Sequence, residues 1–363
     1  MVGMVVVPRP MLDRRRPRLH DLLGNGSQIN LDVTDRYAAI LGRSPSKGAR
    51  SPALWNAAFS DLGLSVVMHP MDVDASALPD VVGALRQDPR FVGGAVTVPH
   101  KSSMVPLLDE IEPEAGMIGA VNCFYRSGQR LVGANTDGEG ALRTLEAAVG
   151  PHGLKGATVI VMGIGGAGRA VATYLAGAVG AGGRLVLASR TAARSDEVRR
   201  HLGSRCAVEL VALPPPVEAL AGCDVLVNCT VVGYEQNLAA HEGGDVTTLR
   251  PYTPLGPITE VAVPDGPDAQ RRHLLAAAAA VDMNLSNSLR ALARLRPGAT
   301  VFDIIYQPSK TLLLALSELY GYRTLNGKGM NLEQAVLAFV RTVRETQDLI
   351  RVRRAMDAAA QRA

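Results

Sequence analysis

A glycine-rich turn between an apolar run and a helix-forming run carries the clearest chemistry in the sequence. Residues 158–162 read TVIVM, which predicts a strand buried on both faces, and residues 163–168 read GIGGAG. Glycines at the first, third and sixth positions allow a tight bend, let backbone N–H groups approach a pyrophosphate, and let the next helix pack on the strand. The turn therefore predicts dinucleotide binding at a helix N-terminus, and the alternative is a tight turn without a ligand. The predicted contact residues are Gly163, Gly165, Gly166, Ala167 and Gly168.

The end of the next predicted strand indicates which dinucleotide is bound. In an NAD site an Asp or Glu usually follows this strand and bonds the ribose 2′-hydroxyl. Here the strand at 184–188 runs into 189–191 (SRT), and no acidic residue occurs before Asp196. A guanidinium suits a 2′-phosphate, so we expect NADP(H), although arginines simply exposed at a strand end would look the same. The predicted contacts are Ser189, Arg190, Thr191 and Arg194.

Three further stretches place polar side chains at the ends of predicted strands or at the start of a helix. A lysine after a strand is usually a solvated charge, and Asn or Asp at a strand end usually bonds local backbone in a turn. Taken one at a time, the three stretches are therefore explained by ordinary loop structure. They are 96–101 (VTVPHK), Asn122 with 135–137 (NTD), and 326–334 (NGKGMNLEQ).

Strands and helices alternate along the chain, which favours α/β architecture with mainly parallel strands in the first part. There the predicted strands are 36–41, 65–68 and 91–98, the helices are 53–59, 78–85 and 139–149, and 119–134 forms a hairpin. In the second part the predicted strands are 158–162, 184–188, 224–228 and 301–306, with a helix of roughly 269–295 before the last. Helical composition at 311–320 and 332–356, without further strand signals, indicates a return to the first domain.

Bulk composition limits the possible partners. The chain has 363 residues, of which 47% are hydrophobic and 20% charged, and this favours two domains of a globular enzyme. The net charge of +4 comes partly from the cluster at 14–18, and only 4% of residues are aromatic, which argues against a nucleic-acid partner. No apolar run approaches the ~20 residues of a membrane span. The four cysteines lack metal-site or disulfide spacing, so we expect reduced thiols, a cytoplasmic location and no metal.

Together, the order and spacing of these stretches resemble the shikimate dehydrogenase family. That family carries VTxPxK, AVNT, NTDxxG, GxGGAxRA, NxTxxG, DxxYxPxxT and GxxMLxxQA motifs in this order. The matching stretches of this chain are 96–101, 119–123, 135–140, 163–170, 228–233, 303–311 and 327–335. The resemblance covers residues from about 36 to 345, and motifs in this order are hard to obtain by chance.

The resemblance implies two lobes with the substrate in the cleft between them and NADP(H) on the second lobe. We expect a mainly parallel α/β substrate lobe from 35–150 plus 310–363, to which the C-terminal helices return. We expect a Rossmann-type NADP-binding lobe from 151–309, with an insertion at 233–296. Residues 1–34 are expected to form a flexible extension, and both a monomer and a homodimer fit.

The resemblance also implies roles for single residues. It makes Lys101 and Asp137 the catalytic pair, in which the lysine either moves the hydroxyl proton or mainly stabilises negative charge on the oxygen. The implied reaction is reversible hydride transfer between NADP(H) and a ring hydroxyl or ketone, as with shikimate and 3-dehydroshikimate in aromatic amino acid biosynthesis. The implied substrate-side residues are Ser51, Thr97, Asn122, Tyr306 and Gln334, and Thr230 is implied on the cofactor side.

Two polar positions of the family pattern are alanines in this chain. The family binds the substrate carboxylate with two serines; Ser51 matches the second, but Ala49 stands at the first, and Ala95 replaces an asparagine. Each lost hydrogen bond is worth roughly 1 kcal/mol, and Lys47 or Arg50 is a candidate replacement contact. Quinate, aminoshikimate or another cyclitol acid therefore stay open as substrates beside shikimate, as does a non-catalytic ligand sensor. A folate-type methylene dehydrogenase fits the last two motifs poorly.

Overall fold

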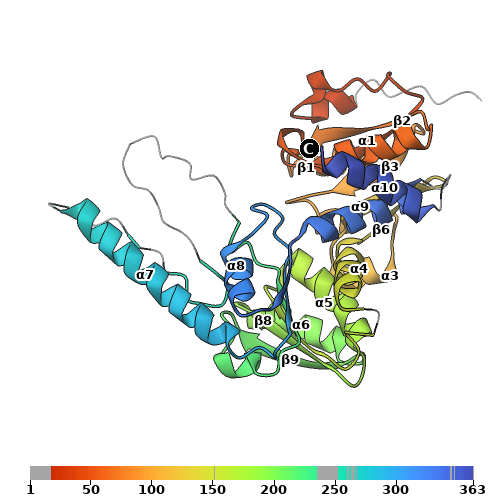
Figure 1. Cartoon of the computed structure of the whole chain (residues 1–363). Coiled ribbons are helices and arrows are strands. Elements are labelled where there is room, and N and C mark those ends of the chain that lie inside the picture. Colours follow the sequence, from red (N-terminus) through yellow and green to blue (C-terminus); the bar gives the residue numbers. More distant parts are fainter. Residues whose placement is uncertain are drawn as a thin grey trace, which may run out of the picture.

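The computed structural model describes residues 18–150, 152–234, 252–259, 261–262, 266, 268–343, 346 and 348–362, without the side chains of 192–195 and 197. The chain forms two α/β lobes, each built on a six-stranded sheet (Figure 1). The predicted two-lobed α/β architecture is confirmed. Part of the predicted insertion, residues 235–251, lies outside the described residues.

The first sheet is mixed and consists of β1 (Arg36–Gly42), β2 (Val66–Asp72), β3 (Phe91–Val96), β4 (Glu110–Ile111), β5 (Cys123–Ser127) and β6 (Arg130–Ala134). Its strand order is β2-β1-β3-β5-β6-β4. The strands β2, β1 and β3 run parallel, β4 runs parallel to β6, and β5 is antiparallel to both β3 and β6. The mainly parallel lobe is thus confirmed, and the predicted hairpin supplies its antiparallel part.

Four helices cover the first sheet, namely α1 (Ser51–Asp61), α2 (Leu78–Gln87), α9 (Lys328–Thr342) and α10 (Leu349–Ala360). Successive side chains of β1 point to opposite faces, so α2 packs on one face and α1, α9 and α10 pack on the other. The fully buried ring of Trp55 in α1 meets that of Phe339 in α9, with centroids 5.2 Å apart. The helices α9 and α10 are therefore the C-terminal helices that return to the first lobe.

Residues 18–34 also belong to the first lobe. Leu23, Ile29 and Leu31 are buried in the same core as α2. The prediction of a flexible extension is wrong for these residues, because their apolar side chains cover a hydrophobic face that would otherwise meet water. Residues 1–17 lie outside the described residues. The short 3-10 helices of this lobe are Leu19–Leu22, Gly26–Gln28, Pro45–Lys47 and Val105–Leu107, and its remaining short helix is α3 (Pro113–Ile118).

The second sheet is entirely parallel and consists of β7 (Thr158–Met162), β8 (Arg184–Ser189), β9 (Ala207–Ala212), β10 (Val225–Asn228), β11 (Thr300–Asp303) and β12 (Arg323–Leu325). Its order, β12-β11-β10-β7-β8-β9, is that of a Rossmann sheet. From β7, the strands are added first on one side (β8, β9) and then on the other (β10, β11, β12), so the strand order reverses between β7 and β10. The carboxyl ends of β7 and β10 therefore border the crevice where such sheets bind ligands.

Helices cover both faces of the second sheet. On one face lie α5 (Gly166–Val179) and α6 (Ala192–Leu202), and on the other lie the 3-10 helix Val217–Leu220, α8 (Leu312–Leu319) and the C-terminal end of α7 (Ala269–Leu292). Because α8 and β12 belong to this lobe, the chain returns to the first lobe at α9 and not at residue 310 as predicted. The three-residue β12 is too short to have given a sequence signal.

The predicted helix near 269–295 is the continuous helix α7, which projects from the body of the second lobe (Figure 1). Asn284, buried in the middle of α7, fixes the preceding loop through two hydrogen bonds with the backbone of Thr253. Among the described residues, no helix combines the length and apolar character that a membrane span requires.

The helix α4 (Asp137–Val149) lies at the junction of the lobes, and two glycines near its N-terminus allow this. A Cβ on Gly138 would overlap the carbonyl oxygen of Ala170 in α5. A Cβ on Gly140 would lie 2.8 Å from the backbone nitrogen of Gln334 in α9. The first turn of α4 is therefore held close to a helix from each lobe.

Candidate active site

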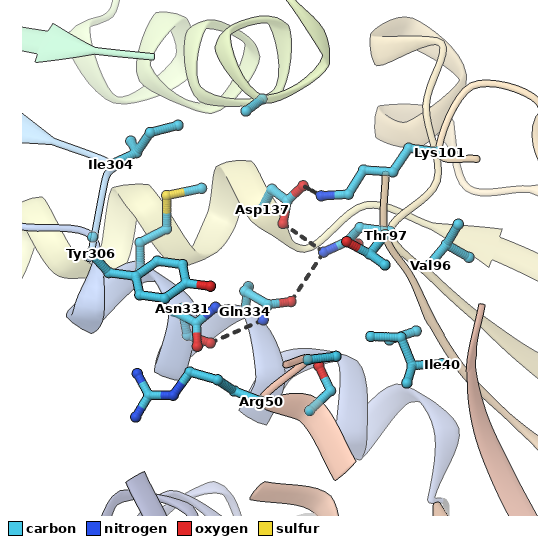
Figure 2. Close-up of a pocket in the computed structure, with 17 residues that line it drawn as sticks. Ile40, Arg50, Val96, Thr97, Lys101, Asp137, Ile304, Tyr306, Asn331 and Gln334 are labelled. Atoms are coloured by element: carbon cyan, nitrogen blue, oxygen red, sulfur yellow. Dashed lines mark hydrogen bonds and ion pairs between the residues drawn. The ribbon is translucent and has the colours of Figure 1, made fainter. Parts of the chain in front are cut away.

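A cavity of about 230 Å³ opens where the two lobes meet, next to the first turn of α4 (Figure 2). The first lobe contributes the end of β3, the start of α1 and part of α9, whereas the second lobe contributes the start of α5 and the loop after β11. All seven residues that the sequence placed at the reaction and substrate positions line it. They are Ser51, Thr97, Lys101, Asn122, Asp137, Tyr306 and Gln334.

Lys101 and Asp137 form an ion pair in this cavity. The Nζ of Lys101 lies 2.7 Å from Oδ2 of Asp137, and the two side chains are 27% and 9% exposed. Asp137 is the first residue of α4, where a negative charge is stabilised by the helix dipole. The turn that carries Lys101 is anchored by the buried ring of His100, whose Nε2 lies 2.7 Å from the carbonyl oxygen of Val73. The pair is therefore held in place and partly accessible.

Asn122 fixes the carboxylate of Asp137 from its other side. The Nδ2 of this buried side chain lies 2.8 Å from Oδ1 of Asp137, 3.0 Å from Oγ1 of Thr136 and 3.2 Å from Oε1 of Gln334. Its Oδ1 accepts a hydrogen bond of 2.7 Å from the backbone N–H of Thr136. Each oxygen of Asp137 thus has its own partner, Lys101 on one and Asn122 on the other, so the carboxylate cannot rotate without losing both.

On the opposite side of the cavity, the polar side chains make fewer hydrogen bonds within the protein. The hydroxyl groups of Ser51 and Tyr306 line it, and neither has a hydrogen-bond partner among the described residues. Ala49 and Ala95, the two departures from the family pattern, also line the cavity with methyl groups. This side therefore keeps polar atoms available for a bound molecule.

Sequence reasoning missed several residues of the cavity. The apolar side chains of Ile40, Val96, Ile304 and Met330 line it, and so does Asn331, whose carbonyl oxygen accepts a hydrogen bond of 3.0 Å from Gln334. Of the two cations that the sequence indicates as candidate replacement contacts, Arg50 lines the cavity and the exposed Lys47 does not. Ile40 carries no signal that separates it from a core residue, whereas Val96, Ile304 and Met330 lie within the matching stretches 96–101, 303–311 and 327–335. Asn331 lies within a quoted motif and could have been found there.

The glycine turn borders the same cavity through Ala167. Gly163 has φ 87°, and a Cβ there would lie 2.7 Å from Cγ2 of Thr230. A Cβ on Gly168 would overlap the carbonyl oxygen of Gly163, whereas Cβ atoms on Gly165 and Gly166 would meet no protein atom within 4 Å. Packing therefore requires the first and last glycines, and the middle two leave open the backbone at the N-terminus of α5. A dinucleotide pyrophosphate fits this cradle.

Thr230 lies in the loop after β10, which is tied to the loop after β11. The Oδ1 of the buried Asn228 accepts hydrogen bonds from the backbone N–H and hydroxyl of Thr230, at 2.9 and 2.7 Å. Its Nδ2 donates to Oδ1 of Asp303 at 3.0 Å. Burial raises the pKa of Asp303 to about 6, although hydrogen bonds from Thr311, Ile305 and Asn228 lower it. This link holds the predicted cofactor side against the loop that carries Tyr306.

The predicted 2′-phosphate contacts lie at the end of β8, the neighbour of β7. Ser189 and Thr191 are joined by hydrogen bonds of 3.1 and 3.2 Å between the Ser189 hydroxyl and the Thr191 backbone. Arg190 is exposed between them. The side chain of Arg194 lies outside the described residues. The run is therefore on the same edge of the sheet as the glycine turn, and its contact with a cofactor stays a prediction.

Comparisons with known proteins agree on one family. The model of the shikimate dehydrogenase substrate-binding domain matches residues 41–124. A shikimate dehydrogenase (NADP(+)) of Geobacter sulfurreducens is 34% identical over 305 residues, which cover 81% of this chain and 86% of that protein. The corresponding enzyme of Geobacter metallireducens is 32% identical over 317 residues, covering 85% and 92%.

Solved structures give the same fold. A shikimate dehydrogenase in complex with NADP+ superposes with a TM-score of 0.66 and 27% identity, covering 91% of this chain and 96% of that one. The enzyme of Thermus thermophilus in complex with NADP(H) and shikimate gives 0.63 and 26%, covering 89% and 99%. A 5-ketofructose reductase of a Gluconobacter strain gives 0.64 and 24%, covering 89% and 98%, and therefore shows the fold alone.

Proposed function

The chain belongs to the shikimate dehydrogenase family, and we propose that it is an NADP-dependent oxidoreductase that interconverts shikimate and 3-dehydroshikimate. The observation that carries this proposal is the Lys101–Asp137 pair at a cavity that the glycine turn also borders. A proton-transfer group and a dinucleotide cradle at one cavity are what hydride transfer to or from a ring carbinol needs.

Lys101 is the group that exchanges the proton with the reacting oxygen. When bound, NADP(H) supplies the hydride acceptor or donor. In the direction of oxidation, the ammonium of Lys101 first releases one proton to solvent, to which its side chain is partly exposed, and the neutral Nζ then takes the hydroxyl proton as hydride leaves the carbinol carbon. In the direction of reduction, the lysine ammonium donates a proton to the carbonyl oxygen. Asp137, fixed by Asn122, keeps Nζ aimed at one place in the cavity and so lowers the orientational cost of the step.

The remaining polar side chains orient the substrate. Thr97 and Gln334 lie near the ion pair (Figure 2), as does Asn122, which bonds Asp137, and all three can bond ring hydroxyls there. The hydroxyl groups of Ser51 and Tyr306 line the cavity as well and are available to the rest of the substrate. The apolar lining, which includes Ile40 and Met330, excludes water around the ring. The alanines at 49 and 95 widen the cavity relative to polar residues, so quinate, aminoshikimate or another cyclitol acid is the second candidate for the same chemistry.

NADP(H) is the proposed cofactor, because the exposed Arg190 follows β8 where an NAD site carries an acidic residue. Relatives named NADP(+)-dependent support this assignment. The four cysteines are free, which favours a reducing compartment such as the cytoplasm. Whether the protein is a monomer or a homodimer stays a prediction.

Turnover of a small substrate panel tests the proposal. The purified protein is assayed with NADP+ or NAD+ and with shikimate, quinate and aminoshikimate, and formation of the reduced cofactor is followed by absorbance. We expect NADP+-dependent oxidation of shikimate, with kcat/KM for NADP+ falling about 10-fold or more in Arg190→Ala, since a charge-assisted contact is lost. The matched control is Arg200→Ala, an exposed arginine further along α6. Absence of turnover on every substrate, combined with ligand binding in calorimetry, would point to a non-catalytic sensor instead.

A further inference from the structure

The cavity carries one unbalanced positive charge. Among the described residues that line it, the charged ones are Arg50, Lys101 and Asp137. Lys101 and Asp137 neutralise each other at 2.7 Å, and within the described part of the chain no carboxylate lies within ion-pair distance of Arg50. Two cations against one carboxylate leave a single positive charge, and it belongs to Arg50, since a guanidinium stays protonated in proteins.

The guanidinium of Arg50 is held in place but keeps most of its donors available. Its Nη2 donates a hydrogen bond of 2.9 Å to the carbonyl oxygen of Ala360 at the end of α10. Its central carbon lies 5.9 Å from the centroid of the Tyr306 ring, within the range of a cation–π contact. Of the five N–H groups of an arginine, the described residues engage one. The other four N–H groups have no hydrogen-bond partner among the described residues.

The surroundings of Arg50 favour an anion. The hydroxyl groups of Ser51 and Tyr306 line the same side of the cavity and have no hydrogen-bond partner among the described residues. Helix α1 begins at Ser51 without a side-chain cap, so its partial positive charge adds to that of Arg50. Figure 2 shows Arg50 on the side of the cavity opposite Lys101 and Asp137, with Tyr306 and Gln334 between them. A fork of guanidinium donors matches the two oxygens of a carboxylate.

We propose that Arg50 is the specificity-determining residue of this cavity and selects substrates that carry a carboxylate. The inference rests on the proposed function and names its substrate class: a hydroxy acid whose carboxylate lies at Arg50 while its reacting carbinol lies at Lys101. A neutral polyol of similar size would leave the charge of Arg50 desolvated without compensation. The fold alone does not determine whether the substrate carries a carboxylate. A protein with the same fold is named 5-ketofructose reductase, and 5-ketofructose is a neutral sugar.

The test compares an acid with its neutral ester in matched variants. Oxidation of shikimate and of methyl shikimate by NADP+ is measured for the unaltered protein, Arg50→Gln, Arg50→Lys and the control Lys47→Gln, which removes an exposed charge outside the cavity. We expect Arg50→Gln to raise KM for shikimate about 10- to 100-fold with little change in kcat, since a charge-assisted contact is lost. KM for the ester should not change, Arg50→Lys should be intermediate, and Lys47→Gln should behave as the unaltered protein.

Two results would overturn the inference. Either KM for acid and ester rises by the same factor in Arg50→Gln, which would mean that Arg50 only supports the fold of the cavity, or neither changes. If the unaltered protein oxidises neither probe, the proposed function fails, and calorimetry of the NADP+-saturated protein still decides the role of Arg50. Tighter binding of acid than of ester in the unaltered protein, lost in Arg50→Gln, supports it; equal binding of both in the two proteins contradicts it.

Discussion

The two sides of the cavity differ in how many hydrogen bonds and ion pairs their polar side chains make within the protein. On one side, both oxygens of Asp137 are occupied, by Lys101 at 2.7 Å and by Asn122 at 2.8 Å, and Asn122 in turn contacts Thr136 and Gln334. On the other side, Ser51 and Tyr306 have no hydrogen-bond partner within the described residues, and Arg50 uses one of its donors.

This difference indicates that one side serves the chemical step and the other side serves substrate recognition. Groups that must act on a reacting atom gain from being fixed before the substrate arrives, because reorganisation then costs nothing during the step. Groups that recognise the rest of the substrate need free donors instead. We therefore expect changes on the side of Asp137 to appear in kcat and changes on the side of Arg50 to appear in KM.

The largest effect is expected for Lys101→Ala. This change removes the proton-transfer group, so kcat should fall by about 10²- to 10⁴-fold, the usual contribution of general acid–base catalysis. Affinity for NADP+, measured by calorimetry, should stay close to that of the unaltered protein. Lys155→Ala, at an exposed lysine away from the cavity, is the control. Activity retained in Lys101→Ala would remove the central residue of the mechanism.

The next effect is expected for Asn122→Ala. The change leaves Oδ1 of Asp137 and the backbone N–H of Thr136 without their partner in a buried place, so the free energy of unfolding should fall by about 1–3 kcal/mol. The carboxylate of Asp137 becomes free to rotate and no longer fixes the position of Nζ of Lys101, so kcat should fall about 10-fold or more. Urea denaturation and steady-state kinetics measure the two effects. A rise in KM with kcat unchanged would place Asn122 on the recognition side instead.

A smaller effect is expected for Tyr306→Phe. The hydroxyl engages no described residue, so its loss should leave stability nearly unchanged and raise KM for shikimate about 5- to 10-fold, as expected for one hydrogen bond of about 1 kcal/mol. Thermal unfolding and steady-state kinetics provide the measurements. A lower kcat at saturating substrate would show that this side also takes part in the chemical step.

The smallest effect on activity is expected at the link between the loops after β10 and β11, where the change appears in the pH dependence of stability. Burial raises the pKa of Asp303 to about 6, above its ordinary value of 3.8, so the folded protein keeps this proton at pH values where the unfolded chain has lost it. The stability contributed by this group is full below about pH 4 and is lost as pH rises to about 6. Asp303→Asn cannot ionise and still accepts from Asn228. Its free energy of unfolding relative to the unaltered protein should therefore rise by about 1–3 kcal/mol between about pH 4 and pH 7. A constant difference across this range would show that folding does not raise the pKa of Asp303.

The parts of the fold that could be predicted are those with strong local signals. The run of 158–162 and the glycines after it specify a buried strand and a tight turn by composition alone, and the structure has both. The strand β9 was missed because it is half exposed and reads AVELVA, and β12 because it has three residues. The sequence predicts a flexible extension at residues 18–34, which is wrong because these residues are stabilised by long-range packing on a hydrophobic face that the local sequence does not reveal.

The same distinction applies to the site. The polar residues that motifs mark, such as Lys101, Asp137 and Gln334, were expected together and lie together. The bond between Asn228 and Asp303 joins residues far apart in sequence, and only the sheet topology brings them into register. Arg50 was one of two candidate cations for a substrate contact, and only the structure separates it from Lys47.

The claim that the Lys101–Asp137 side serves the chemical step and the Arg50 side serves substrate binding is tested most directly by the rate of hydride transfer in a single turnover. The measurement compares Lys101→Ala and Arg50→Gln with the unaltered protein, with both NADP+ and shikimate saturating. We predict that Lys101→Ala slows the step by about 100-fold or more, whereas Arg50→Gln transfers hydride within about threefold of the normal rate once its weaker binding is overcome. Equal slowing in both variants, or a normal rate in Lys101→Ala, would contradict the account.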